Sequence, residues 1–339
     1  MKRHGPLVAA GVLMVLTVLL LRAGGKDAVP AMGRRAMERR LEGLVELTQR
    51  PSPSSSPSPS PSPSPEPVAV ETVEEAWDEV LRQTAPEPSP IRVEGAVSLE
   101  LRNETDYDID FTQLPALPEG LALDTKDPVV LIVHTHGSES YAQDSGQSDA
   151  VFRTQDETKS VIAVGETMAQ TLEKRGYGVV HDKTLCDYPE YTGAYNRSRT
   201  VIQENLEQYP SLVLVLDVHR DAVENSDGTQ MRMACTVGDT EMSQLMLVVG
   251  TDDGGLEHPS WRENLSLAAV LQARLSAQYP GMMRPMNLRT ERFNQDLGAL
   301  SLLVEVGASG NSLAEARESA ACFADMLAAV LDDYCGKSS

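Results

Sequence analysis

Three apolar segments of this 339-residue chain each carry side chains that can bind a metal ion or transfer protons. These side chains are His134, His136 and Glu139 after segment 129–133, Asp217, His219, Arg220 and Asp221 at the end of segment 212–219, and Glu305 within segment 299–306. Two histidines and a carboxylate suit a catalytic zinc ion whose fourth position is open for water. A further carboxylate would accept a proton from that water and pass it to a leaving amine. The sequence therefore predicts a metal-assisted hydrolytic site.

Each of these features also has a purely structural interpretation. A histidine at the end of a strand is often packed, hydrogen-bonded or simply solvated. Glu305 stands in an otherwise apolar segment, where burying a carboxylate is costly unless it is paired or functional. From the residues alone, Glu305 is either part of a buried ion pair or a catalytic group. Convergence of the three clusters at one place would favour the metal site.

Other catalytic chemistries have no motif in this chain. It contains no His-Glu-x-x-His, no Gly-x-Ser-x-Gly and no P-loop sequence. Ser138 and Ser140 are candidate nucleophiles of a serine-type acyl hydrolase, but neither lies in a recognised motif. Neither C-x-x-C nor zinc-finger spacing relates the four cysteines, which are Cys186, Cys235, Cys322 and Cys335. The cysteines are therefore either buried free thiols or joined in one or two disulfides.

The apolar periodicity predicts the elements that would bring the clusters together. Strands are expected at 97–102, 129–133, 178–181, 212–219, 231–237, 245–250 and 299–306. Helices are expected at 159–175, 196–209, 261–279 and 312–335. Apolar strands that alternate with helices predict an α/β fold, with a mainly parallel sheet and helices on both faces. Because parallel strands end at one edge of a sheet, the three clusters can meet there.

Three regions are predicted along the chain. Residues 1–28 form an N-terminal signal anchor, because a basic flank precedes an apolar stretch and no small-x-small cleavage site follows it. A cleaved signal peptide is the alternative. Residues 29–90 form a stalk and linker, since alternating proline and serine adopt extended conformations and cannot build a core. Residues 91–339 then form a catalytic domain, held at the cell membrane by a single pass and lying outside the cytoplasm.

The charge and composition limit the partners of this domain. The formal net charge of −21 argues against binding to the phosphate backbone of a nucleic acid. Aromatic residues make up 4% of the chain, so a stacking platform for bases is not expected. An acidic balance suits an extracytoplasmic domain and a substrate that is not strongly anionic.

Several short motifs occur in a fixed order between about residues 95 and 330. They include His134-Thr-His-Gly-Ser-Glu-Ser-Tyr141, Asp217-Val-His-Arg-Asp221 and Leu303-Val-Glu-Val-Gly307, with further motifs at 103–110, 161–165, 181–182, 191–198, 258–264 and 293–297 and with Asn311. With the anchor and the low-complexity stalk, these motifs make the chain resemble the stage II sporulation protein P family of cell-wall hydrolases. Ser160 departs from the pattern, which has Asn before the Val-x-x-Val-Gly helix.

The resemblance implies a zinc-dependent N-acetylmuramoyl-L-alanine amidase that also has endopeptidase activity on peptide cross-links. It implies a fold like that of zinc amidases and carboxypeptidases, with His, Glu and His as ligands and a Glu in the last strand as base. On this chain, His219 is then a zinc ligand and Glu305 is the catalytic carboxylate. His136 is preferred over His134 as the other histidine ligand, because it precedes Gly137 as in related amidases.

Two positions are open for the carboxylate ligand. Glu139 follows His136 by three residues, a spacing that zinc carboxypeptidases use. Glu157 lies just before the 159–175 helix, where related amidases carry their ligand. We favour Glu139. Arg220 and Asn311 are candidates for polarising the scissile carbonyl or binding substrate carboxylates, since arginine suits bidentate carboxylate recognition.

The family's role in engulfment during sporulation implies partners besides peptidoglycan and the membrane. These are a lytic transglycosylase of the sporulation protein D type and a membrane scaffold. The alternative function is a non-catalytic cell-wall binding or scaffold module of the same fold. The intact histidine clusters and Glu305 disfavour that alternative.

Overall fold

The computed structural model describes residues 91–93, 99–117, 127–142 and 152–334. The predicted anchor at 1–28 and stalk at 29–90 lie outside these residues and stay predictions. Within the described ranges, no helix combines the length and the apolar character that crossing a membrane requires. The helices and strands described below all belong to the segment predicted as the catalytic domain.

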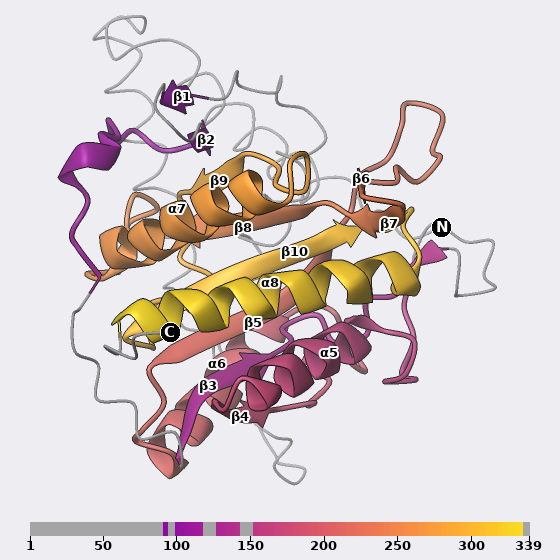
Figure 1. The fold of residues 1–339 in the computed structure, drawn as a ribbon. Coiled ribbons are helices and arrows are strands. Elements are labelled where there is room, and N and C mark those ends of the chain that lie inside the picture. Colours follow the sequence, from indigo (N-terminus) through magenta and orange to yellow (C-terminus); the bar gives the residue numbers. More distant parts are fainter. Residues whose placement is uncertain (1–90, 94–98, 118–126, 143–151, 335–339) are drawn as a thin grey trace, which may run out of the picture. The chain divides into compact units, whose positions relative to one another are not determined.

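Eight strands form one sheet in the order β1-β2-β9-β8-β10-β5-β3-β4 (Figure 1). Their bounds are β1 Ile91–Val93, β2 Leu99–Asn103, β3 Pro128–Val133, β4 Gly178–His181, β5 Leu214–Asp221, β8 Leu245–Gly250, β9 Met286–Arg289 and β10 Leu300–Ala308. β4, β3, β5 and β10 are parallel, whereas β8 is antiparallel to β10 and parallel to β9. A separate hairpin contains β6, Ala234–Val237, and β7, Thr240–Ser243. The predicted mainly parallel sheet is confirmed, but the reversal at β8 was not predicted.

The α-helices of the described residues cover both faces of this sheet (Figure 1). Their bounds are α5 Val161–Lys174, α6 Ala194–Gln208, α7 Trp261–Gln278 and α8 Leu313–Tyr334. α5, α7 and α8 lie over one face, and α6 packs on the other. Side chains alternate along a strand, so Leu131 and Val133 pack with Ile202 of α6, while Val130 and Ile132 join the core on the opposite face. The prediction of helices on both faces is confirmed.

The strand register places the predicted catalytic side chains on the α6 face of the sheet. His219 of β5 lies beside Glu305 of β10, and Asp217 of β5 lies beside Val133 of β3. Directly paired residues of neighbouring strands point to the same side, and residues two apart share a face. Asp217, His219 and Glu305 therefore lie on the face that α6 covers, near the carboxyl ends of their strands.

Helix α5 approaches the sheet closely at Gly165. A Cβ atom there would lie 2.6 Å from His134 Nε2 and 2.9 Å from His181 Nε2. Replacing a glycine inside a helix by alanine usually stabilises it by about 1 kcal/mol. We expect Gly165→Ala instead to lower the free energy of unfolding by about 1–3 kcal/mol, because the added methyl group overpacks two enclosed rings. Urea unfolding measures the change, and a stabilised variant would contradict this close approach.

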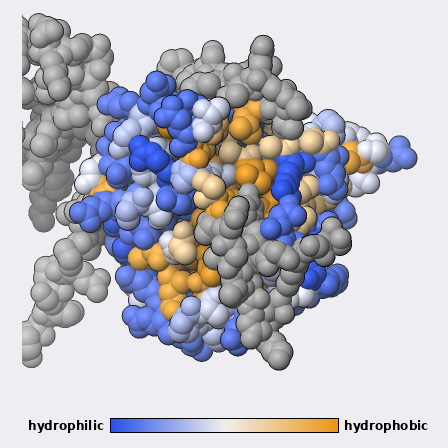
Figure 2. Space-filling view, turned by 60° about the vertical axis from the view of Figure 1, so that its left-hand side comes forward, coloured by the Kyte–Doolittle hydropathy of each residue, from blue (hydrophilic) through white to orange (hydrophobic). Residues whose placement is uncertain are grey.

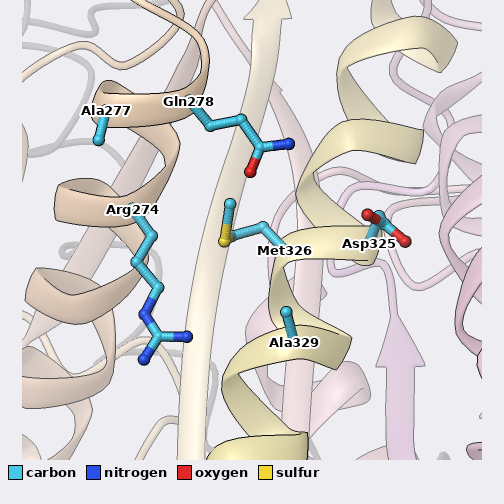
Figure 3. Close-up of a pocket in the computed structure, with 6 residues that line it drawn as sticks. All are labelled: Arg274, Ala277, Gln278, Asp325, Met326 and Ala329. Atoms are coloured by element: carbon cyan, nitrogen blue, oxygen red, sulfur yellow. The ribbon is translucent and has the colours of Figure 1, made fainter. Parts of the chain in front are cut away.

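A hollow of about 470 Å³ lies between α7 and α8 (Figure 3). Its lining residues are Arg274, Ala277 and Gln278 from α7 and Asp325, Met326 and Ala329 from α8. Both helices cover the face opposite α6, so the sheet separates this hollow from His219 and Glu305. The hollow is therefore not part of the predicted catalytic site.

The surface of the molecule is mostly hydrophilic in the view of Figure 2, where hydrophobic residues gather in a band between hydrophilic areas. Among the described residues, the large hydrophobic side chains that are exposed are Tyr188, Tyr191 and Leu256. Two of the three stand in the segment between β4 and α6. That segment is therefore a candidate for contact with other molecules.

The cysteines of the described residues are free thiols. They are Cys186, Cys235 and Cys322, whereas Cys335 lies outside the described residues. Cys186 is buried, and burial raises its pKa to about 12. Burial and a raised pKa both disfavour the thiolate, so they disfavour Cys186 as a nucleophile.

Candidate functional site

His136, Glu139 and His219 lie together where β3 and β5 end. The ring centroids of His136 and His219 are 5.4 Å apart, and His219 Nδ1 is 3.6 Å from Glu139 Oε2. All three residues are buried, with exposed fractions of 5%, 6% and 3%. The structure thus brings together the three residues that were predicted as metal ligands.

Asp217 lies against the second nitrogen of the His219 ring. Its Oδ1 is 2.9 Å from His219 Nε2, although the geometry is that of an ion pair and not of a well-aligned hydrogen bond. Thr135 donates to the same carboxylate from its backbone nitrogen and its hydroxyl group. Burial works to lower the pKa of His219, but Asp217 and Glu139 outweigh it and raise that pKa well above its ordinary value. The two carboxylates thus favour positive charge at His219, whether a proton or a bound cation carries it.

Arg220 holds Glu139 in place. The backbone nitrogen of Arg220 donates to Glu139 Oε2 over 3.1 Å, and Arg220 Nη1 lies 3.9 Å from Glu139 Oε1. The rest of the guanidinium donates to the backbone oxygens of Ser140 and Phe152. Burial works to raise the pKa of Glu139, but Arg220 and His219 hold it below its ordinary value. Arg220 was predicted to act on the substrate, whereas these contacts turn its side chain toward the chain segment that carries Glu139.

His134 lies on the opposite face from His136. Its Nδ1 is 2.9 Å from the Val218 oxygen, and its Nε2 is 2.9 Å from His181 Nε2. Both ring nitrogens of His134 are therefore occupied by contacts within the protein. His136 Nδ1, by contrast, is buried and has no hydrogen-bond partner in the described part of the chain. Burial lowers the pKa of His136 to about 3, so its ring is neutral at neutral pH, which is the form that binds a metal.

Glu305 is buried beside His219, with an exposed fraction of 3%. Arg289 of β9 points to the same face and interacts electrostatically with Glu305. Arg289 Nε is also 3.2 Å from Glu104 Oε2 and 3.3 Å from Glu291 Oε2. The α6 face thus carries a buried carboxyl group next to the predicted ligands, which is the arrangement that acid–base catalysis needs.

Three further residues that the sequence analysis did not single out surround His136. The ring of Tyr191 stacks on His136, with centroids 4.4 Å apart and an angle of 14° between the planes. The Arg153 guanidinium lies 4.3 Å from the Tyr191 centroid and donates to Asp187. Asp187 Oδ2 is 3.9 Å from His136 Nδ1. Tyr191 stands in a family motif and could have been found, whereas contacts between loops leave no periodic signal for Arg153 and Asp187.

Neither of the two serines near this site is hydrogen-bonded to a histidine within the described residues. Ser138 Oγ donates to Asp187 over 2.6 Å and accepts from Arg153 over 3.2 Å. Ser140 Oγ is buried without a hydrogen-bond partner in the described ranges. A serine nucleophile needs a base that can take its proton, and the Asp187 carboxylate next to Ser138 is ion-paired with Arg153, which makes it a weak base. These contacts therefore disfavour the serine-type hydrolase.

Asn311 has a structural role, and its contacts do not support the predicted contact with substrate, which stays a prediction. It is fully buried, and its four hydrogen bonds join it to the backbone nitrogens of Met233 and Ala308, the Met233 oxygen and Glu315 Oε2. A side-chain amide has two donor and two acceptor positions. All of them are used here, and Asn311 organises the turn between β10 and α8.

Glu157, the other candidate for the carboxylate ligand, is exposed just before α5, whereas Glu139 is buried beside His219. Ser160 caps that helix, and its side chain accepts a hydrogen bond from the Ile162 nitrogen. Asparagine and serine are both favoured at the N-cap, the position directly before the first helical residue. The departure from the family pattern at Ser160 therefore preserves the same local function.

The donor set suits zinc, although no group of three or more His, Cys, Asp or Glu side chains in the described residues is arranged to hold a metal ion as it stands. Ligands bound to one zinc ion at about 2.0–2.2 Å would lie about 3.4 Å apart. The 3.6 Å between His219 Nδ1 and Glu139 Oε2 is close to that value. With the buried, unbonded Nδ1 of His136, these observations fit a two-histidine, one-carboxylate site.

A family model decides the family of the chain. The model described as Stage II sporulation protein P matches residues 51–328. The chain belongs to the Stage II sporulation protein P family. The Stage II sporulation protein P of Bacillus subtilis (strain 168) is 28% identical over 211 residues, which are 59% of this chain and 50% of that protein. The chain thus aligns with about half the length of this curated relative.

Solved structures of amidases show a distant likeness to this member of the Stage II sporulation protein P family. The amidase AmiC2 of Nostoc punctiforme has a TM-score of 0.34 at 14% identity, covering 62% of this chain and 96% of that one. The CwlD amidase of Clostridioides difficile, solved with the GerS lipoprotein, has a TM-score of 0.37 at 11% identity, covering 62% and 100%. Such distant likeness concerns the fold alone. The assignment of the candidate site depends on the contacts between its own residues.

Proposed function

We propose that this chain is a zinc-dependent peptidoglycan hydrolase that cleaves the amide bond between N-acetylmuramic acid and L-alanine. The proposal depends on one observation, which is that His136, Glu139, His219 and Glu305 meet at one sheet edge. Membership in the Stage II sporulation protein P family supports peptidoglycan as the substrate and sporulation as the setting.

Each residue of the site has a defined part in this proposal. His136, Glu139 and His219 would hold zinc, with Asp217 orienting the His219 ring and Arg220 orienting Glu139. Zinc bound there supplies Lewis acidity and a water molecule that is acidic enough to react near neutral pH. The Glu305 carboxylate would accept a proton from water and would give it to the leaving amine.

The wider biology of the proposal follows from the family. The engulfment role would place the domain outside the cytoplasm, anchored by residues 1–28, with a lytic transglycosylase and a membrane scaffold as partners. Endopeptidase activity on peptide cross-links would use the same site. A non-catalytic cell-wall binding module is the second candidate, and the buried Glu305 beside His219 disfavours it, because binding alone does not need it.

Mass analysis of the products tests the proposed function. The full chain is loaded with zinc and incubated with purified peptidoglycan, with and without a chelator. We expect zinc-dependent release of stem peptides with a free L-alanine amino group, complete loss of release after chelation, and recovery when zinc is restored. Binding to peptidoglycan without any cleavage would instead support the binding module, and cleavage that survives chelation would rule out zinc catalysis.

A further inference from the structure

Phe293 and Asn294 have an unusual backbone conformation next to the candidate site. Their φ angles are 50° and 56°, and they are the non-glycine residues with positive φ in the described part of the chain. This left-handed region is unfavourable for residues with a side chain, above all for a bulky one such as phenylalanine. Strained residues of this kind persist where the surrounding structure forces them, and they cluster at functional sites.

The segment around Phe293 is held by a set of side-chain hydrogen bonds. Asn294 Nδ2 donates to the Tyr195 oxygen over 2.8 Å. Gln295 accepts from the Gly250 nitrogen over 2.8 Å and donates to the Val248 oxygen over 2.9 Å. Asn294 and Gln295 are buried, with exposed fractions of 6% and 1%. These bonds tie the segment directly after Phe293 both to α6 and to β8.

The Phe293 side chain is only partly buried, and it continues a line of rings that begins at His136. The centroids of His136 and Tyr195 are 5.6 Å apart, and those of Tyr195 and Phe293 are 5.8 Å apart. On its other side, the Phe293 ring lies 5.9 Å from the guanidinium carbon of Arg289, which interacts with Glu305. Phe293 thus stands between the predicted ligand and the side chain that neighbours the predicted base.

We infer that Phe293 is a substrate-contacting, specificity-determining residue of the hydrolase. With Tyr195 it forms an apolar wall that packs against the methyl-bearing lactyl and L-alanyl part of the substrate, next to the scissile amide. A partly exposed phenylalanine in a strained backbone stabilises the fold little, and a contact with substrate explains why the segment is built to hold it there. The inference rests on the proposed function, whose substrate contact it specifies.

The experiment compares three replacements of Phe293 in the full, zinc-loaded chain, with a soluble muropeptide as substrate. In Phe293→Ala and Phe293→Gly we expect KM to rise about tenfold with little change in kcat, because a wall contact that serves substrate and transition state equally is lost. Phe293→Tyr keeps the ring and should keep the wild-type KM. Phe293→Gly should melt at a higher temperature than Phe293→Ala, because glycine adopts the left-handed conformation without strain.

Tyr209→Ala is the matched control, since it removes a partly buried ring from the far end of α6, about 20 Å from Tyr195 along the helix. It should leave KM unchanged. Wild-type KM in both Phe293→Ala and Phe293→Gly would overturn the inference, as would a Phe293→Gly variant that melts below Phe293→Ala.

Calorimetric binding of the same muropeptide separates this inference from the proposed function. If the wild type binds the muropeptide without cleaving it, the proposed function fails. Weaker binding by Phe293→Ala would still support the apolar wall in that case.

Discussion

His219→Ala should lose both its bound zinc and its hydrolytic activity. The replacement removes a predicted ligand and leaves Asp217 and Glu139 buried without the ring that lies 2.9 Å and 3.6 Å from their oxygens. Asp217 keeps its hydrogen bonds from Thr135 and Glu139 keeps Arg220, but both buried carboxylates lose the ring between them, so the variant should also unfold more easily. Zinc content measured by atomic absorption and muropeptide release measured by mass spectrometry check the two losses.

His134→Gln is the matched control for this variant. It also changes a buried histidine of the same sheet edge, but one that faces α5 and whose nitrogens contact Val218 and His181. We expect it to keep about one zinc ion per chain and to keep activity in its folded fraction. If His134→Gln lost zinc while His136→Ala kept it, the assignment of the first histidine ligand would have to be reversed.

Glu305→Gln should keep its zinc and lose hydrolysis by about 10²–10⁴-fold, which is the usual contribution of a general base or acid. Glutamine has the shape of glutamate but cannot accept the proton of the attacking water. Because the change preserves volume in a buried strand, the fold should persist. The measurements are kcat on a soluble muropeptide, zinc content and circular dichroism.

Glu166→Gln provides the comparison for Glu305→Gln. Glu166 contacts His181 and Lys183 on the α5 side of the sheet, so the variant loses a carboxylate without touching the candidate site. It should hydrolyse muropeptides at the wild-type rate. Equal activity in Glu305→Gln and in the wild type would exclude Glu305 as the proton acceptor and would return it to the role of a buried ion-pair residue.

The elements of the domain could be predicted well because they depend on local periodicity. The apolar runs 129–133 and 212–219 became β3 and β5, and the helix predicted at 159–175 became α5 with Ser160 as its cap. β7 and β9 were missed because neither contains a run of β-branched apolar residues like the one that identified the equally short β4. The reversal at β8 was missed because strand direction depends on pairing, which periodicity does not contain.

The site could be predicted as a set of residues, but not as an arrangement. His134 and His136 are equivalent in sequence, and only the path of the chain after Val133 puts them on opposite faces. Asn311 looked available for substrate, yet two of its four hydrogen bonds join it to the backbone of Met233, 78 residues away in the chain. Arg153 and Asp187 had no signal at all, because loops carry them to His136 without any regular spacing.

The residue types of the candidate site and the strands that deliver them were predictable from the chain alone, because side-chain chemistry and strand periodicity are local properties. Only the tertiary structure decided which histidine faces His219, which glutamate lies within 3.6 Å of it, and that Phe293 is held beside Tyr195. The physical reason is that register, strand direction and hydrogen bonds between loops depend on contacts between distant segments, and those contacts exist only when the chain has folded.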